Sequence, residues 1–280
     1  MSLTACGGGG TASIPWPGHE GESPAVNYAA AQAAVQELNY YRAMASAPPV
    51  TLDYQLSLAC QLHADYMGLN HVSLRDVGLA AHQESPGMPG YSAVGAAAAA
   101  NSVIYQGVGP VTAVDNWMST FYHRLGLLDV NLGRIGFGSS GQYQVMDAHR
   151  GRLSAGEEQQ AVALFPAPGM SAVPTSFVTE IPYPIPADTS LGVPITVEFS
   201  GPYGLIIELA QAELINDLSG IAVPCYVQTP GEPFLPGWDY PQVICLIPRD
   251  PLPRGARQRV VVSAEVGGTP WSADWTFTTR

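Results

Sequence analysis

The side chains that could carry out chemistry in this chain are a few histidines and carboxylates. His123 lies six residues after Trp117, in the run Trp117-Met118-Ser119-Thr120-Phe121-Tyr122-His123-Arg124. His82 and Glu84 stand close together in a segment punctuated by Gly and Pro. Imidazoles and carboxylates bind divalent metals and transfer protons. If the fold brings these groups together, they could support acid–base catalysis or metal-assisted hydrolysis.

Other chemistry is excluded by what the sequence lacks. All eleven basic residues are arginines, so a Schiff-base lysine, a lysine general base and a Walker-type phosphate loop are impossible. The chain has no Gly-x-Ser-x-Gly elbow, no His-Glu-x-x-His helix and no Rossmann glycine fingerprint. The formal net charge of −12 argues against nucleic acid and anionic membrane surfaces, which attract basic patches. No apolar run of the sequence reaches the length of a membrane span.

Apolar periodicity predicts the elements that must position these groups. A first helix is expected from Ser23, as N-cap with Pro24 at the first helical position, to about Ala45. Asp53 is expected to cap a second helix, whose apolar stripe places His63 in the core. Residues 92–105 and 110–125 read as two further helices. Strands are predicted at residues 133–138, 142–147 and 161–165.

Four motifs in this order resemble the bacterial branch of the CAP superfamily, which includes cysteine-rich secretory proteins, venom antigens and plant pathogenesis-related proteins. They are Leu38-Asn39-Tyr40-Tyr41-Arg42-Ala43, the helix segment from Leu56 to Met67, the run from Trp117 to Arg124, and Ile135-Gly136-Phe137-Gly138. The resemblance covers roughly residues 24–150. It implies an α+β fold in which helices flank a short antiparallel sheet as an α-β-α sandwich.

The resemblance also implies a groove. Eukaryotic members gather two histidines and two glutamates there, and some bind a divalent metal. His82 falls near the place of the first histidine, and His123 matches the histidine of the bacterial motif. Alanine stands where the first glutamate is expected, in Ala99-Ala100-Asn101, and Thr120 stands at the second position. The groove candidates are therefore His82, Glu84, Asn101, Asp115, Trp117 and His123, with Glu84 or Asp115 as substitute carboxylates.

His82 and His123 are also the candidate ligands of a divalent metal such as zinc. Two histidines alone make a weak zinc site, because catalytic zinc normally has three protein ligands. Each histidine has a structural alternative as well; His123 could bond a strand carbonyl and lock a helix to the sheet. No cofactor is otherwise indicated.

The sequence pattern changes at Pro168. Short alternating runs separated by turn residues predict an all-β sandwich, with strands at residues 195–199, 221–227, 243–247, 259–266 and 271–279. The last two runs resemble the end of a bacterial Ig-like domain. The expected organisation is a flexible tether at residues 1–22, a CAP-like domain at 23–167 and an Ig-like domain at 168–280.

The cysteines indicate an exported protein. Leu3-Thr4-Ala5-Cys6, followed by four glycines, resembles a bacterial lipobox without its preceding signal segment, so Cys6 is a candidate for acylation. Cys225 and Cys245 lie on two strand-like runs and could form a disulfide in an oxidising compartment. We therefore expect a lipoprotein of the bacterial cell envelope, periplasmic or extracellular, with no transmembrane span.

Three functions are consistent with these features. The missing glutamates and the groove aromatics favour a non-enzymatic binder of a small apolar ligand, a lipid or a peptide. The alternative is a hydrolase, a peptidase or esterase, that uses His82 and His123 with a metal or with Glu84. The third is an inert envelope scaffold that contacts other envelope proteins through the Ig-like region.

Overall fold

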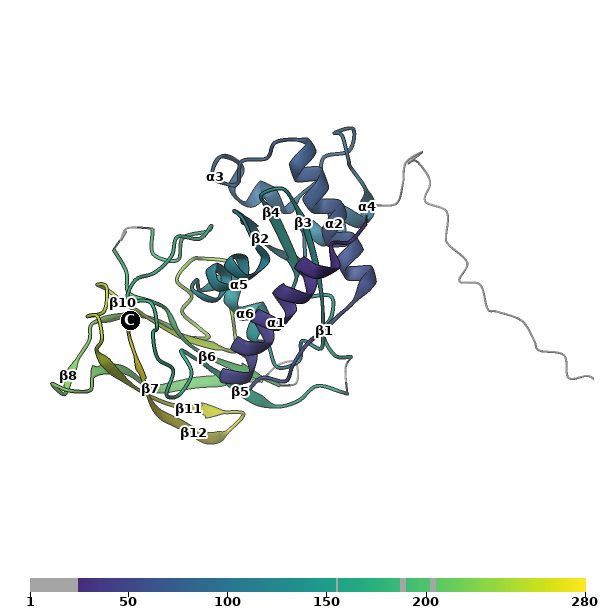
Figure 1. Ribbon diagram of the computed structural model, residues 1–280. Helices are drawn as coiled ribbons and strands as arrows, with labels where there is room; N and C mark the ends of the chain where they lie inside the picture. Colours follow the sequence, from purple (N-terminus) through teal and green to yellow (C-terminus); the bar gives the residue numbers. More distant parts are fainter. Residues whose placement is uncertain (1–24, 155, 187–189, 202–204) are drawn as a thin grey trace, which may run out of the picture.

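The computed structural model describes residues 25–154, 156–186, 190–201 and 205–280. The predicted tether with Cys6, and the predicted helix start at Ser23 and Pro24, lie outside these residues. Figure 1 shows helices around a sheet in the first half of the chain and a separate group of strands in the second half.

The N-terminal region is built on a four-stranded sheet with helices on both faces. The strand order is β1 (Thr51–Leu52), β3 (Arg134–Ser140), β4 (Tyr143–Asp147) and β2 (Ser102–Gln106). The helices are α1 (Tyr28–Met44), α2 (Tyr54–Leu69), α3 (Leu74–Val77), the 3₁₀ turn η1 (Gly78–His82), α4 (Ala93–Ala99), α5 (Pro110–Met118) and α6 (Tyr122–Leu128). One core joins α1 and α5 to the sheet, and a second joins α2 and α4 to its other face. The expected α-β-α sandwich is confirmed.

Capping residues set the starts of the two long helices. The Asp53 carboxylate accepts hydrogen bonds from the amides of Gln55 and Leu56 at 2.9 and 3.0 Å, as the sequence predicts for α2. Helix α1 instead begins at Tyr28, after Asn27, whose side chain accepts from the Ala30 amide. The predicted start at Ser23 is therefore wrong by one turn or more, because Asn27 provides the cap.

Two glycines of β3 allow α2 to lie directly on the sheet. A Cβ atom at Gly136 would approach the backbone of Leu56 to 2.2 Å, and one at Gly138 would approach the amide nitrogen of Gln61 to 2.2 Å. Ile135 and Phe137 alternate with these glycines and are buried in the opposite core. In the motif Ile-Gly-Phe-Gly, the two glycines thus allow the close contact with α2, and Ile135 and Phe137 pack into the core on the other face of the sheet.

Two segments that were each predicted as a single helix form two separate elements in the structure. Residues 92–105 divide into α4 and the strand β2, because the β-branched Val103 and Ile104 pair with β4. Residues 110–125 divide into α5 and α6. At this break the hydroxyl groups of Ser119 and Thr120 donate to backbone carbonyls one turn earlier, which competes with helical hydrogen bonding.

The C-terminal region consists of two four-stranded antiparallel sheets. The first has the order β5 (Ala161–Phe165), β6 (Ile195–Ser200), β10 (Val243–Pro248) and β9 (Cys225–Gln228). The second has the order β12 (Thr269–Thr278), β11 (Arg257–Val266), β7 (Ile207–Asn216) and β8 (Ile221–Ala222). Apolar residues of both sheets form one core between them. Residues 221–227, predicted as one strand, form β8 and β9 in different sheets.

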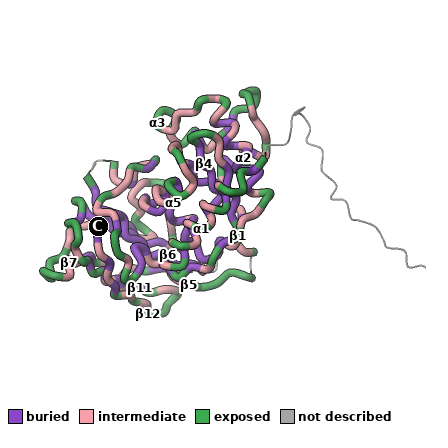
Figure 2. The backbone as a smooth tube through the Cα atoms, in the orientation of Figure 1, coloured by how far each residue is buried: buried purple, intermediate pink, exposed green. Residues whose placement is uncertain are grey.

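The first of these sheets is covered on both faces. In β10, Ile244 and Leu246 enter the core between the two sheets, whereas Val243, Cys245 and Ile247 pack against α6. Every residue of β6 and β10 is buried, and Figure 2 shows this buried band between the two regions. Strand β5 pairs with β6 and not with the N-terminal sheet, so its predicted place in the α-β-α sandwich is wrong. The predicted domain boundary at residue 168 thus falls after a strand of the second region.

The predicted disulfide is not formed. Cys225 and Cys245 lie on adjacent strands, but the register pairs Cys225 with Pro248 and Cys245 with Gln228. An offset of three residues in a strand spans roughly 10 Å and turns the two side chains to opposite faces, beyond the Cα separation of about 7 Å that a disulfide tolerates. Both are free thiols. Among the described residues, no helix is long and apolar enough to cross a membrane.

Candidate functional site

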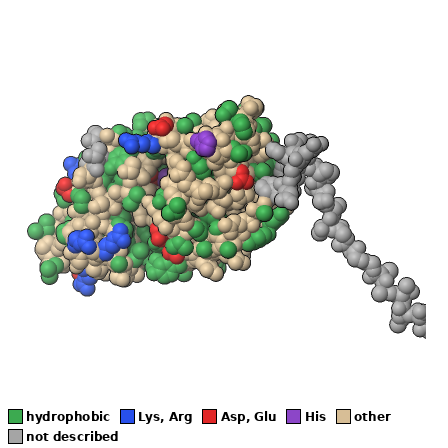
Figure 3. Space-filling view, turned by 45° about the horizontal axis from the view of Figure 1, so that its top comes forward, with side chains coloured by type: hydrophobic (Ala, Val, Ile, Leu, Met, Phe, Trp, Pro, Cys, Tyr) green, Lys and Arg blue, Asp and Glu red, His purple; other side chains and the backbone are tan. Residues whose placement is uncertain are grey.

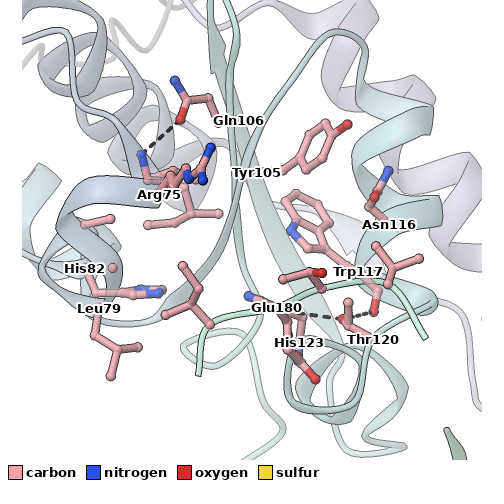
Figure 4. Close-up of a pocket in the computed structure, with 17 residues that line it drawn as sticks. Arg75, Leu79, His82, Tyr105, Gln106, Asn116, Trp117, Thr120, His123 and Glu180 are labelled. Carbon is pink, nitrogen blue, oxygen red and sulfur yellow. Dashed lines mark hydrogen bonds and ion pairs between the residues drawn. The ribbon is translucent and has the colours of Figure 1, made fainter. Parts of the chain in front are cut away.

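A cavity of about 550 Å³ lies between η1 and the α5–α6 junction, and it contains both candidate histidines. Figure 4 shows His82 on one side of the cavity and Trp117, Thr120 and His123 on the other. Apolar side chains form much of the wall, including Leu79, Ile104, Val178 and Ile181. Charged side chains are sparse on the molecular face in Figure 3, which is largely hydrophobic or uncharged polar. The cavity is therefore a mainly apolar site with a few polar groups, as is usual for small-ligand pockets.

His82 is presented by the end of η1. Its Nδ1 lies 3.0 Å from the carbonyl oxygen of Ala99, so Nδ1 carries the hydrogen and Nε2 is left with a free lone pair. Burial lowers the pKa of His82, because it disfavours the cation, and the Ala99 hydrogen bond offsets this only in part. At neutral pH His82 is thus a neutral imidazole whose Nε2 can accept a hydrogen bond or a proton.

His123 has a different environment, since it is paired with a carboxylate. Its Nδ1 lies 3.0 Å from Oε2 of Glu180, and the Thr120 hydroxyl is 3.3 Å away. The Glu180 carboxylate is buried and also accepts the backbone amides of Phe121 and Tyr122 at 2.8 and 3.0 Å. Glu180 therefore caps the start of α6 and orients the His123 ring, as a carboxylate partner does in many catalytic and metal-binding histidines.

His63 and Glu84 form a second histidine–carboxylate pair, which lies outside the cavity lining. Both side chains are fully buried, with His63 Nδ1 3.0 Å from Glu84 Oε1 and His63 Nε2 3.0 Å from the Ala81 carbonyl. Glu84 Oε2 accepts the Ser92 amide. The prediction of Glu84 as a groove carboxylate is wrong, because His63 and Ser92 occupy it. The pair does fix the backbone one residue before His82 and so holds that histidine in place.

Trp117 supplies an unpaired donor to the cavity. The residue is 2% exposed, and its indole Nε1 has no hydrogen-bond partner among the residues that the structure describes. Figure 4 shows this nitrogen on the side of the ring that faces the cavity. A buried donor without a partner costs about 1 to 3 kcal/mol, and an acceptor on a ligand would recover that cost.

The other two candidates lie elsewhere. Asn101 donates its side-chain amide to the Ala97 carbonyl at the end of α4 and does not line the cavity. Asp115 lies on α5 but faces a neighbouring cavity, where it accepts a hydrogen bond from the Tyr41 hydroxyl at 2.8 Å. Of the six candidate residues, the structure brings together His82, Trp117 and His123.

The donor set does not fit a metal site. No group of three or more His, Cys, Asp or Glu side chains close enough to hold a metal ion occurs in the described part of the chain. The Nδ1 atoms of both cavity histidines and the Glu180 carboxylate are already hydrogen-bonded within the protein. The cavity thus offers two Nε2 atoms, one fewer ligand than a catalytic zinc normally takes.

Residues 35–148, which contain both cavity histidines, match the family described as CAP, the cysteine-rich secretory protein family. This stretch is a CAP domain. A comparison of the whole chain with curated proteins finds no match. One of the two positions where the resemblance implied glutamates, Thr120, still approaches His123 through its hydroxyl group, whereas at the other the run Ala99-Ala100-Asn101 bonds His82 only through the backbone carbonyl of Ala99.

Glu180 is the site residue that sequence reasoning missed. It lies 57 residues after His123 in the proline-rich segment that follows the CAP domain. No local pattern links it to the cavity, because its contacts are all long-range. The only sequence signal is a single acidic residue within the apolar run Phe177-Val178-Thr179-Glu180-Ile181. A carboxylate from outside the matched residues 35–148 thus lies against His123, although the CAP domain itself has neither of the two expected glutamates.

Proposed function

We propose that the CAP domain is a non-enzymatic binding module whose cavity takes a small, largely apolar ligand or a peptide. The unpaired Trp117 Nε1 carries this proposal, because a buried donor on an apolar wall provides a specific partner for a ligand oxygen. Among the described residues that line the cavity, Glu180 is the one carboxylate, and it is engaged by His123 and the α6 amides. A ligand acceptor facing Trp117 would therefore meet little repulsion.

The test is to isolate a bound molecule and then to fill the cavity. Purified full-length protein is extracted and analysed by mass spectrometry, alongside a Leu79→Trp variant and the matched control Leu218→Trp. Leu79 lines the cavity and is 43% exposed, and Leu218 is 96% exposed on a turn outside it, so both positions accept a larger side chain. We expect the wild type and Leu218→Trp to retain a ligand that Leu79→Trp loses. A protein that carries no ligand, and binds neither lipids nor peptides, would overturn the proposal.

The Glu180–His123 pair favours a second candidate, an acid–base hydrolase. Here the His82 Nε2 atom takes a proton from the attacking water, and His123, oriented by Glu180, is the group that donates a proton to the leaving group of an ester or amide. Trp117 Nε1–H would stabilise the developing negative oxygen. Activity on ester and peptide substrates should then be lost in His82→Ala and in His123→Ala. Activity unchanged in the double variant would remove this candidate.

We propose that the C-terminal sheets form an Ig-like spacer or adhesion module of an exported lipoprotein anchored through Cys6. The two-sheet core and the lipobox-like Leu3-Thr4-Ala5-Cys6 support this assignment. Envelope fractionation with Cys6→Ser tests the anchor, because release of the variant into the soluble fraction is expected. An inert scaffold is the remaining alternative; it predicts that Leu79→Trp leaves every envelope partner bound.

A further inference from the structure

A second cavity of about 390 Å³ adjoins the first along α5. Asn116 and Val178 line both cavities, so the cavities meet at these two residues, which we call the neck. Helix α5 contributes Thr112 and Asp115 to the second cavity and Trp117 to the first. Pro174 and Val178 also line the second cavity, and residues 178–181 line the first. The two cavities therefore lie next to each other along α5.

The second cavity is lined by both polar and apolar groups. Its polar groups include the Asp115 carboxylate, the Tyr41 hydroxyl and Arg280, and its apolar groups include Phe165 and Met170. The Asp115 Oδ1 atom accepts from Tyr41 and remains able to accept from a ligand N–H. An acyl chain would offer no hydrogen-bonding group to the Asp115 carboxylate or to Arg280, whereas a peptide offers an N–H, a carbonyl and a side chain at each residue.

We propose that the two cavities are subsites of one cleft that binds a short peptide lying along α5. One peptide carbonyl accepts from Trp117 Nε1, one apolar side chain enters each cavity, and a peptide N–H donates to Asp115. This inference rests on the proposed binding function and specifies its ligand class.

The neck allows the inference to be tested separately from the binding function. Val178→Trp fills the neck, and Val111→Trp places the same side chain on α5 at a position that is 40% exposed and lines neither cavity. Asn116→Phe is a second neck variant, to be used if Val178→Trp does not fold by circular dichroism. The probes are a library of short peptides, palmitate, and the small fluorophore anilinonaphthalene sulfonate, which needs only one cavity.

We expect peptides from the library to bind the wild type and Val111→Trp with equal affinity and the neck variants at least about tenfold more weakly. Fluorophore binding should remain in all of them. In the wild-type complex, nuclear Overhauser contacts from one peptide should reach both the His123 ring and the Met170 methyl group. Equal peptide affinity in the neck variants, or binding of palmitate alone, would overturn the inference while leaving the binding function intact. Absence of binding by every probe would overturn both.

Discussion

At the scale of single residues, the two cavity histidines differ in what surrounds them. His82 is held by a neutral carbonyl and is partly desolvated, whereas His123 is bound to the carboxylate of Glu180. Two identical side chains thus have different partners within one cavity. Each ring is thus held through its Nδ1 atom, by a carbonyl in one case and by a carboxylate in the other.

The lowered pKa of His82 predicts a loss of stability in acid. Because the folded state disfavours the His82 cation, it binds fewer protons than the unfolded state once the pH falls below about 6.5. Unfolding free energy should therefore decrease from pH 7 towards pH ~5, and His82→Gln should reduce that decrease. Urea denaturation at a series of pH values measures the effect, with the exposed His71→Gln as control. An identical decrease in His82→Gln would contradict the assignment.

Replacing Glu180, which lies outside the CAP domain, should lower the stability of the protein. In Glu180→Gln, an amide NH₂ group replaces an oxygen that accepts from the α6 backbone, and the partner of His123 loses its charge. We expect a loss of about 1 to 3 kcal/mol in unfolding free energy, measured by chemical denaturation. Glu213→Gln, on an exposed position of β7, is the matched control. Equal stability of the two variants would show that the Glu180 contacts contribute little.

At the scale of elements, the close contact between α2 and β3 is the most restrictive feature of the CAP domain. Both sides of the cavity depend on this contact. Helix α2 carries His63, which bonds the Ala81 carbonyl next to His82, and the sheet supports α5, which carries Trp117. A small displacement of α2 would move the Ala81 carbonyl and hence His82.

Gly138→Ala should therefore destabilise the protein strongly. The new Cβ atom would meet backbone atoms of Cys60 and Gln61, which cannot move without shifting the helix. We expect a loss of about 1 to 3 kcal/mol or more, seen as a lower thermal midpoint. Gly231→Ala is the control, because no atom lies within 4 Å of its added Cβ. Equal midpoints would mean that α2 is less tightly placed than the structure shows.

The sequence predicted those elements whose signals are local. The Asp53 cap, the β3–β4 hairpin and the alternation in Ile135-Gly136-Phe137-Gly138 each follow from neighbouring residues. The break between α5 and α6 could not be predicted in this way, because α6 is capped by the distant Glu180. Strand β5 was placed in the wrong sheet for the same reason, since its partner β6 lies 30 residues and more further along the chain.

The candidate site, too, could be predicted only in part from the sequence. His82 and His123 do share a cavity with Trp117. Glu84 was the nearest carboxylate in sequence, yet the buried His63 binds it in the fold. The carboxylate nearest to His82 in the sequence is therefore not in the cavity. The carboxylate that does line it, Glu180, is brought there by the tertiary fold.

At the scale of the whole molecule, the junction between the two regions is polar as well as apolar. Arg124 of α6 donates to the Pro194 carbonyl and stacks on Phe165 of β5. Glu198 of β6 is buried at this junction, and within the described part of the chain one of its carboxyl oxygens has no hydrogen-bond partner. Burial raises its pKa to about 8, although the charges of Arg42, Arg152 and Arg124 act in the opposite direction.

Glu198 predicts a stability that falls as the pH rises. Its pKa is raised from 4.5 to about 8, so the folded state keeps a proton that the unfolded state releases over that interval. Glu198→Gln should be more stable than the wild type above pH 8, by more than about 1 kcal/mol, and the difference should disappear near pH ~5. Denaturation curves at both pH values test this, with the exposed Glu265→Gln as control. A pH-independent difference would argue against titration of Glu198.

The sheet that is covered on both faces has a consequence for how the chain opens. Strand β10 packs against α6 on one face of its sheet, and both β6 and β10 pack against the second sheet on the other, so separating the two regions would expose this sheet. Their amide hydrogens should be the slowest in the molecule to exchange with deuterated solvent, and both regions should lose protection in a single event. A protease should accordingly find no cleavage point that releases the CAP domain as an intact fragment. Early exchange in β6, or a stable fragment ending near residue 150, would show that the two regions open independently.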